Sequence, residues 1–224
     1  MRVLTIALML ALAGGCDLLP GKSAPPEPRH IVIGLDLSKS NPLVTDQLYA
    51  SKVGKRVGGM IENLPMKSKV TLRTFGVYNA TFNTLRLDRQ ISRRYPAEEV
   101  ARVVDGLIAG VPQLVNRGTL TAQNKTNILS FMDNMSQIVN CDEVETIVIL
   151  ASDGIEDSEL ARQTRDVEGL PSPEGAPFQG CKRLEILGIG QGVNLPSVTA
   201  RLRREWSQWA RAAGFEEFRG LNDW

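Results

Sequence analysis

Three oxygen-bearing side chains follow an apolar run near the start of the chain. In "IVIGLDLSKSNPL", residues 31–43, Asp36 ends the run, and Ser38 and Ser40 follow at alternate positions. Another carboxylate, Asp153, follows a second apolar run in "ILASDG". Carboxylates combined with neutral hydroxyls make a set of hard oxygen ligands, which is the kind that magnesium prefers. If the two runs are strands that end at the same edge of a sheet, these side chains point toward the same place.

The elements that would position these side chains alternate along the chain. Continuous apolar runs, or alternating apolar and polar residues, indicate strands, while apolar residues at helical spacing indicate helices. Pro112 is expected to disturb the second predicted helix. The predicted strands are 29–38, 69–79, 81–92, 145–151 and 184–189, and the predicted helices are 47–64, 97–115, 127–139 and 195–214.

This alternation predicts an α/β fold with a mostly parallel sheet. Strands with near-continuous apolar runs are buried on both faces, so helices must cover both sides of the sheet. The alternating patterns at 69–79 and 81–92 indicate two strands joined by a polar turn near Asn79. In sheets of this class, ligands bind beyond the carboxyl ends of the strands, where the strand order reverses. Asp36 and Asp153 occupy such strand ends.

Three motifs along the chain resemble those of one known family. "DLSKS", residues 36–40, resembles the Asp-x-Ser-x-Ser signature of the von Willebrand factor type A (VWA) domain, where it forms the metal-ion-dependent adhesion site (MIDAS). "KTNILSFMDNM" resembles the loop in which a threonine opens the following helix, which assigns Thr126. "VILASDGIED" resembles the strand that ends in Asp-Gly, which assigns Asp153. The resemblance covers residues 30–221.

The resemblance implies the VWA fold. This fold is a Rossmann-like, doubly wound, mostly parallel six-stranded sheet with one antiparallel edge strand and helices on both faces. The chain departs from the family pattern in one loop, where Lys125 stands at a position at which glycine is common, and where Thr119 and Thr121 offer rival hydroxyls. Thr126 is the predicted third hydroxyl because it stands at the start of a predicted helix.

The resemblance also implies how the site binds its ligands. In this family the serine and threonine hydroxyls contact the metal directly, and the aspartates act largely through bound water. By this analogy the metal residues are Asp36, Ser38, Ser40, Thr126 and Asp153, and the cation is Mg²⁺, with Mn²⁺ and Ca²⁺ as alternatives. An Asp or Glu of a protein partner would complete the coordination. Taken singly, the same residues could instead cap helices and turns.

These features favour a binding module over an enzyme. A metal-dependent hydrolase would need a general base or an activated nucleophile. His30 is the only histidine and stands just before the apolar run 31–35, at the other end of the first predicted strand from Asp36, and the sequence has no Gly-x-Ser-x-Gly elbow. The glycines of "GIGQG" lack the helix start and the acidic residue of a dinucleotide site, so no nucleotide is expected. A metal-independent structural subunit of an envelope, secretion or conjugation complex is the alternative.

Composition and charge argue against nucleic acid as a partner. The 224 residues carry 26 basic and 25 acidic side chains, a formal net charge of +1, and the basic residues are scattered along the sequence. Binding to a phosphate backbone calls for a basic patch or stripe. Nucleic acid is therefore not an expected partner.

The region after Asp153 is open to more than one interpretation. Glu156, Asp157 and Glu159 could form a solvated loop or attract a second cation. The proline- and glycine-rich region 155–180 follows a predicted strand end, so it is a candidate for partner specificity.

The N-terminal residues resemble an export signal. "MRVLTIALMLALAGGC" has one arginine, an apolar stretch too short to span a bilayer, and small residues before Cys16. It resembles a bacterial lipoprotein signal, in which cleavage leaves the cysteine to carry lipid, although Ala13 stands where leucine is usual. We therefore expect a signal peptide at 1–15, a lipidated cysteine with a proline-rich linker at 16–29, and a folded domain at 30–224.

Lipidation would tether the folded domain to a membrane. Two or more acyl chains on one cysteine make anchoring stable. Asp17 resembles the signal that keeps many lipoproteins of double-membraned bacteria in the inner membrane. The expected location is thus the cell envelope, with the domain facing the periplasm.

Export would also place the other two cysteines in an oxidising compartment. Cys141 and Cys181 each stand just ahead of a predicted strand. If those strands are parallel neighbours, the two Cα atoms lie within the distance that a disulfide requires. A disulfide is the favoured prediction, and two buried free thiols are the alternative.

Overall fold

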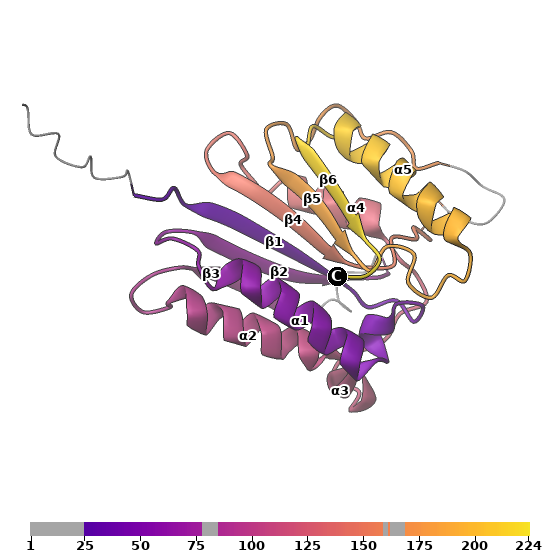
Figure 1. Ribbon diagram of the computed structural model, residues 1–224, viewed down its shortest axis with the longest axis horizontal. Helices are drawn as coiled ribbons and strands as arrows, with labels where there is room; N and C mark the ends of the chain where they lie inside the picture. Colours follow the sequence, from indigo (N-terminus) through magenta and orange to yellow (C-terminus); the bar gives the residue numbers. More distant parts are fainter. Residues whose placement is uncertain (1–24, 78–84, 159–160, 162–168) are drawn as a thin grey trace, which may run out of the picture.

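A computed structural model describes residues 25–77, 85–158, 161 and 169–224 (Figure 1). The predicted signal peptide and Cys16 lie outside the described residues. The strands are β1 (Arg29–Asp36), β2 (Lys69–Phe75), β3 (Arg86–Gln90), β4 (Glu145–Ala151), β5 (Arg183–Leu187) and β6 (Glu217–Leu221). The helices are α1 (Gln47–Ile61), α2 (Ala97–Ala109), α3 (Val111–Asn116), α4 (Ile128–Ser136) and α5 (Pro196–Ala212), with a short 3-10 helix at Pro42–Val44.

The six strands form one sheet in the order β3-β2-β1-β4-β5-β6. β3 is antiparallel to β2, and every other neighbouring pair is parallel. This confirms the predicted doubly wound α/β sheet with one antiparallel edge strand. From β1 the chain passes to β2 on one side and later to β4 on the other. The strand order therefore reverses between β1 and β4, and the ligand crevice of such a sheet lies beyond the ends of these two strands.

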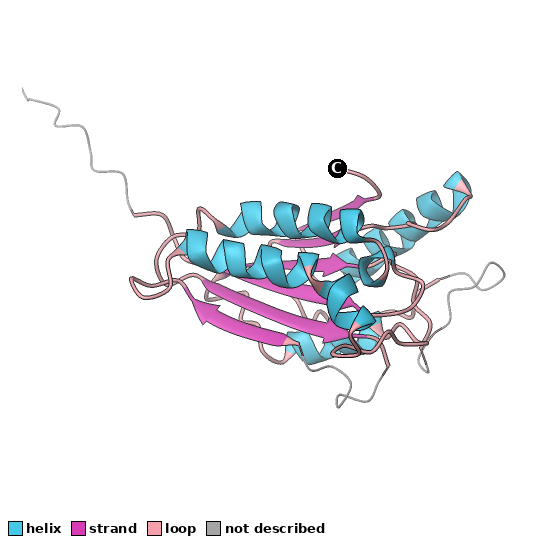
Figure 2. Ribbon diagram, turned by 90° about the horizontal axis from the view of Figure 1, so that it is seen from below, coloured by secondary structure: helices cyan, strands magenta, loops and turns pink. Residues whose placement is uncertain are grey.

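Helices cover both faces of the sheet, and each face has its own apolar core (Figure 2). Successive side chains of a strand point to opposite faces. Ile31, Ile33 and Leu35 of β1 accordingly join the core under α1 and α2, while Val32 joins the core under α4 and α5. Gly34 also faces α4, where a Cβ atom would lie 2.7 Å from a ring carbon of Phe131. A side chain at position 34 would therefore push α4 away from the sheet.

The helix and strand boundaries differ from the predicted ones in a few places. The predicted helix 97–115 is two helices, α2 and α3, that meet at Gly110. Pro112 occupies the first turn of α3, where a missing N–H costs nothing, because first-turn amides have no helical acceptor. α4 is shorter than the predicted 127–139. Asn79, the predicted turn residue, lies outside the described residues.

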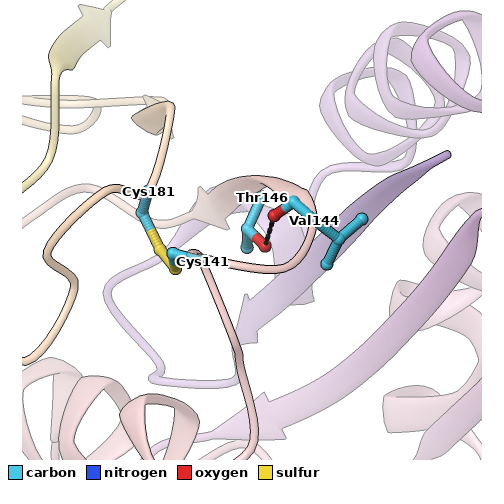
Figure 3. Close-up of a disulfide and its surroundings, with 4 residues drawn as sticks. All are labelled: Cys141, Val144, Thr146 and Cys181. Carbon is cyan, nitrogen blue, oxygen red and sulfur yellow. Dashed lines mark hydrogen bonds between the residues drawn. A yellow bond between two sulfur atoms is a disulfide. The ribbon is translucent and has the colours of Figure 1, made fainter. Parts of the chain in front are cut away.

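A disulfide joins Cys141 to Cys181, as predicted (Figure 3). The two Cα atoms are 4.7 Å apart, because the segments that lead into the parallel neighbours β4 and β5 begin side by side. Next to it, the hydroxyl of Thr146 donates a 2.9 Å hydrogen bond to the carbonyl of Val144, at the start of β4. The disulfide thus joins the segments at the N-terminal ends of β4 and β5.

Two tryptophans of α5 and the single histidine of the chain are buried. Trp206 and Trp209 of α5 are buried, and the indole N–H of Trp206 donates a 2.7 Å hydrogen bond to the carbonyl of Gly154. His30 is buried at the start of β1, and its Nε2 lies 3.0 Å from the hydroxyl of Thr71. Within the described residues, no helix is long and apolar enough to cross a membrane.

Candidate metal centre

Asp36 and Asp153 lie at the switch point of the sheet. Asp36 is the last residue of β1, and Asp153 follows β4 by two positions. The parallel register pairs Leu35 with Ala151, so the two chains leave the sheet side by side. Both aspartates are buried, with exposed fractions of 0% and 1%. The fold therefore places two carboxylates where doubly wound sheets bind ligands.

Two hydrogen bonds orient the carboxylate of Asp36. Oδ1 accepts a 2.8 Å bond from the backbone N–H of Ser38, and Oδ2 accepts a 2.7 Å bond from the hydroxyl of Ser152. Each carboxylate oxygen retains a second lone pair after accepting one bond. The side chain is thus fixed in direction and still able to bind a cation.

Burial and mutual repulsion disfavour the charge on both carboxylates. Burial raises the pKa of Asp36 to about 7, and the negative charge of Asp153 adds to that effect. Burial also raises the pKa of Asp153, while hydrogen bonds from the Ile155 backbone and the Ser40 hydroxyl act in the opposite direction. Among the described residues, neither carboxylate forms an ion pair. A bound cation would relieve this unfavourable charge.

The two predicted serines lie together beside these carboxylates. The hydroxyl oxygens of Ser38 and Ser40 are 3.2 Å apart. Ser38 is buried and Ser40 is exposed, so the pair leads from the interior to the surface. Ser40 also hydrogen bonds to Asp153, which connects the loop after β1 to the loop after β4. The structure thus brings four predicted metal residues, Asp36, Ser38, Ser40 and Asp153, to one place.

The backbone of Thr126 is fixed at the same edge of the sheet. Thr126 and Asp157 exchange two backbone hydrogen bonds, of 3.1 and 3.0 Å. Three residues earlier, Gln123 pairs with the loop after β1, because its N–H donates to Leu37 and its carbonyl accepts from Lys39, each at 2.8 Å. The loop that contains Thr126 therefore bonds to both metal-site loops. Thr126 is buried, unlike its rivals Thr119 and Thr121, which are exposed.

Glu156 has a role that the sequence interpretation missed. The sequence predicted either a solvated loop or a second cation site for Glu156, but its side chain is buried. Its Oε2 accepts hydrogen bonds from the backbone N–H groups of Ile128 and Leu129, at 2.8 and 3.1 Å. These are first-turn amides of α4, so the carboxylate caps the helix that follows Thr126. Glu159 of the same predicted cluster lies outside the described residues.

Asn41 is a second side chain that sequence reasoning missed. It is fully buried, and its amide nitrogen donates to the carbonyl of Asp36 at 3.2 Å and to that of Ala151 at 3.0 Å. The amide therefore joins the ends of β1 and β4. The available signal was a short polar side chain before a proline, since Asn41 also caps the 3-10 helix by accepting from the N–H of Leu43.

The predicted metal ligands are all oxygen atoms, from carboxylates and hydroxyls. In the described part of the chain, no three His, Cys, Asp or Glu side chains come together as a metal site. The predicted set instead has two carboxylates, and its other members are hydroxyls. Hard oxygen donors suit magnesium, manganese or calcium rather than the thiolate and imidazole sites of zinc. The residues present thus fit the kind of cation that the sequence predicts.

Comparison with known proteins identifies no family. No protein-family model and no curated protein matches the chain. Among solved structures, it is similar to the pilus adhesin SpaC from Lactobacillus rhamnosus GG, with 13% identity over 88% of this chain and 28% of that chain, and a TM-score of 0.47. It is also similar to the hypothetical protein BatB from Bacteroides thetaiotaomicron, with 15% identity, coverage of 88% and 91%, and a TM-score of 0.45.

A third similar structure is the manganese-loaded TRAP protein of Plasmodium vivax, with 15% identity, coverage of 84% of this chain and 73% of that chain, and a TM-score of 0.44. Identities and TM-scores this low transfer no ligand or partner to the chain. The topology itself agrees with the sheet that the resemblance implies. The protein therefore has a Rossmann-like α/β fold, with two buried carboxylates and two serine hydroxyls at the switch point of its sheet.

Proposed function

We propose that this protein is a membrane-anchored binding module that holds a divalent cation at the switch point of its sheet and engages a protein partner through that cation. The juxtaposition of Asp36 and Asp153 carries the proposal. Two buried carboxylates at neighbouring strand ends are unfavourable by themselves, and within the described residues no basic side chain pairs with either. Ser38 and Ser40 complete a polar path from these carboxylates to the surface.

The residues that would hold the cation are Asp36, Ser38, Ser40, Thr126 and Asp153. A bound Mg²⁺, Mn²⁺ or Ca²⁺ would supply positive charge to the carboxylates and an open position for an anionic oxygen. An Asp or Glu on the partner is the side chain with the matching charge and donor atom. Engagement of a partner through the cation requires no chemical change in that partner, so the role proposed for the domain is binding rather than catalysis.

The proposed anchor agrees with where the chain enters the fold. In this proposal a signal peptide at 1–15 is removed, Cys16 carries lipid, and the linker ends where β1 begins at Arg29. β1 has eight residues, a length of about 26 Å at the rise of a strand. The candidate metal centre stands at the far end of β1, so an anchored domain would present it away from the inner membrane and toward the periplasm.

Divalent-metal binding to the domain from Gly21 onward tests the proposal. This fragment keeps every described helix and strand and both apolar cores. We expect calorimetry with Mg²⁺ and Mn²⁺ to show saturable one-to-one binding that Asp36→Asn and Asp153→Asn abolish. Asp133→Asn is the matched control, because it removes an exposed carboxylate from α4 and should leave the affinity unchanged. A folded wild-type domain that binds neither ion would overturn the metal-dependent mechanism.

The partner is tested separately. We expect proteins captured from an envelope extract in Mg²⁺ to be released by a chelator and to be absent with the Asp153→Asn variant. Capture that persists with both the chelator and the variant would contradict cation-dependent engagement. It would favour a metal-independent structural subunit instead.

A further inference from the structure

The β2–β3 edge of the sheet carries a marked excess of positive charge. Residues 67–94, which include both strands, contain seven basic residues and one acidic residue, although the whole chain has 26 basic and 25 acidic residues. The acidic one, Asp88, is paired with Arg73, whose Nη2 lies 2.9 Å from both carboxylate oxygens. The other six basic side chains, all exposed, are Lys67, Lys69, Arg86, Arg89, Arg93 and Arg94.

The fold gathers five of these six at one end of the strands. Because β3 is antiparallel to β2, the segment after β3 lies beside the segment before β2. The backbone N–H of Lys67 donates a 2.9 Å hydrogen bond to Ile91, and Lys69 pairs with Gln90. We call the exposed side chains at this end the basic patch, which comprises Lys67, Lys69, Arg89, Arg93 and Arg94.

Two tight turns present the basic patch to solvent. Ser92 and Tyr95 exchange backbone hydrogen bonds of 3.0 and 3.1 Å across a turn that has Arg93 and Arg94 at its tip. The guanidinium groups of Arg89 and Arg94 lie 5.3 and 5.5 Å from the ring centre of Tyr95, so one aromatic ring holds two arginines close together. Like charges kept this close make the surface strongly attractive to anions.

The second turn adds an apolar side chain to the basic patch. The N–H of Ser68 bonds to the carbonyl of Pro65 at 3.2 Å, which leaves Met66 and Lys67 at the tip of the turn. Met66 is 52% exposed, and Lys67 has a positive φ of 72°. An exposed apolar tip flanked by cations is typical of protein surfaces that enter the headgroup region of an anionic membrane.

The patch adjoins the point where the linker reaches the fold. The backbone N–H of Arg29, the first residue of β1, donates a 3.0 Å hydrogen bond to the hydroxyl of Ser68. In Figure 1 the chain before β1 leaves the molecule at the same end as the α1–β2 and β3–α2 connections. Cys16 lies 13 residues before Arg29, which an extended proline-rich chain spans in about 40 Å. The basic patch is therefore within reach of the membrane surface.

The rest of this end of the sheet offers little free positive charge. Arg29 pairs with Glu145 at 2.8 Å, and Lys182 pairs with Glu216 at 2.7 Å. Over β4, β5 and β6, basic side chains are thus matched by acidic ones. Among the described residues at this end, the β2–β3 half gathers the excess of exposed cations, with Glu62 at the end of α1 and Glu98 and Glu99 in the first turn of α2 as its acidic neighbours. This gives the molecule a basic side with which to meet an anionic surface.

We propose that the basic patch, together with Met66, docks on the anionic lipid headgroups of the membrane that holds the linker. This inference rests on the anchoring part of the proposed function and is independent of the metal. Docking would hold the basic end of the domain against the membrane and keep the candidate metal centre, at the far end of β1, on the side that faces the periplasm. Each basic residue close to an anionic membrane strengthens binding about fivefold, so the loss of three should weaken it about a hundredfold.

Vesicle cosedimentation of the lipid-free domain from Gly21 onward tests the proposal, in a chelator so that no cation bridges protein and lipid. The probes are vesicles with 30% phosphatidylglycerol and vesicles of phosphatidylcholine alone. The patch variant combines Lys67→Asn, Arg93→Gln and Arg94→Gln. The matched control combines Lys55→Gln, Arg117→Gln and Arg204→Gln, which removes three exposed charges elsewhere. Thermal unfolding checks that both variants fold.

We expect the wild-type domain to bind the anionic vesicles and to dissociate from them as salt is raised from 50 to 500 mM. It should not cosediment with the neutral vesicles. The patch variant should lose about a hundredfold in affinity, and the control variant should lose less than fivefold. Equal losses in both variants, or no binding of wild type to anionic vesicles, would overturn the proposal. So would binding to a DNA or heparin polyanion without binding to vesicles. We expect neither variant to change metal binding measured by calorimetry, so the two proposals can fail separately.

Discussion

Two regions of the sheet bury carboxylates completely but surround them differently. Glu185, in the middle of β5, is 0% exposed and lies between two arginines, with Arg56 of α1 at 3.2 Å and Arg183 at 3.1 Å. Asp36, at the end of β1, is also 0% exposed, but the charged group that acts on it is another carboxylate, Asp153. One carboxylate is neutralised within the chain, and the other is not.

The difference separates a structural role from a binding role. Burying an ion is costly unless a partner of opposite charge is supplied. At Glu185 the chain supplies two arginines, so the negative charge is compensated within the folded protein. At the candidate metal centre the hydrogen bonds from Ser38 and Ser152 orient the carboxylate but supply no positive charge. Such a site is favourable only when something outside the chain brings positive charge.

The largest effect should come from breaking the neutralised group. Glu185→Gln removes the negative charge but leaves Arg183, which is 14% exposed, and Arg56 beside a neutral amide. We expect the free energy of unfolding to fall by about 3 kcal/mol, because the substitution breaks the buried ion pair and leaves Arg183 only the partly exposed Glu217 as a partner. Urea unfolding at pH 7.5 measures this change, and Mg²⁺ should not alter it.

Glu217→Gln is the control for that variant. Glu217 pairs with the same Arg183, with its Oε2 at 3.3 Å from Nη1, but its side chain is 39% exposed. Partly exposed ion pairs contribute between 0 and about 1 kcal/mol. Similar losses in both variants would show that burial does not distinguish Glu185, and the comparison with Asp36 would lose its basis.

A buried group that stays neutral sharpens the comparison at the opposite end of β1. Burial, assisted by the charge of Lys69 and opposed by that of Asp88, lowers the pKa of His30 to about 4. Between pH 6.5 and 4 the unfolded chain therefore binds more protons at this residue than the folded chain does. His30 thus contributes stability that is present above pH 6.5 and lost as the pH falls toward 4.

The variant His30→Gln isolates this contribution. Glutamine can still hydrogen bond to the hydroxyl of Thr71 and does not titrate. When the pH is lowered from 7.5 to 4.5, wild type should lose about 2 kcal/mol more unfolding free energy than the variant does. Urea unfolding at both pH values measures this difference. An unchanged difference between variant and wild type at the two pH values would contradict the shifted pKa.

The sequence predicts the fold well because the signals for it are local. The continuous apolar run of 145–151 coincides with β4, and the alternating patterns on either side of Asn79 mark the two antiparallel strands. Where the prediction differs, a local residue is responsible, as at Gly110, which separates α2 from α3. Strand ends then place Asp36 and Asp153 by topology alone, without any knowledge of side-chain contacts.

Contacts between distant segments could not be predicted in this way. Asn41 bonds to a carbonyl 110 positions away, and Glu156 caps a helix that begins 28 positions before it. Neither partner has a sequence pattern that identifies the other. The basic patch was missed for a related reason, since its members are separated along the sequence until antiparallel pairing brings Lys67 beside the segment after Gln90. Charge summed over the whole chain hides such a patch.

The smallest effect should have the opposite sign to the one at Glu185. Asp36→Asn keeps an oxygen to accept from the N–H of Ser38 and places an amide against Ser152, whose hydroxyl can turn to accept from it. Because the substitution removes a buried negative charge beside Asp153, we expect the free energy of unfolding to rise by about 1 kcal/mol in a chelator at pH 8. Urea unfolding measures the gain, and Asp133→Asn, an exposed control, should show none.

Mg²⁺ should stabilise wild type, by about 2.7 kcal/mol at a hundred times its Kd, and leave the Asp36→Asn variant unchanged. If the variant instead loses stability in the chelator, the carboxylate of Asp36 stabilises the metal-free fold as Glu185 does. The chain then loses no unfolding free energy by burying this carboxylate without a cation.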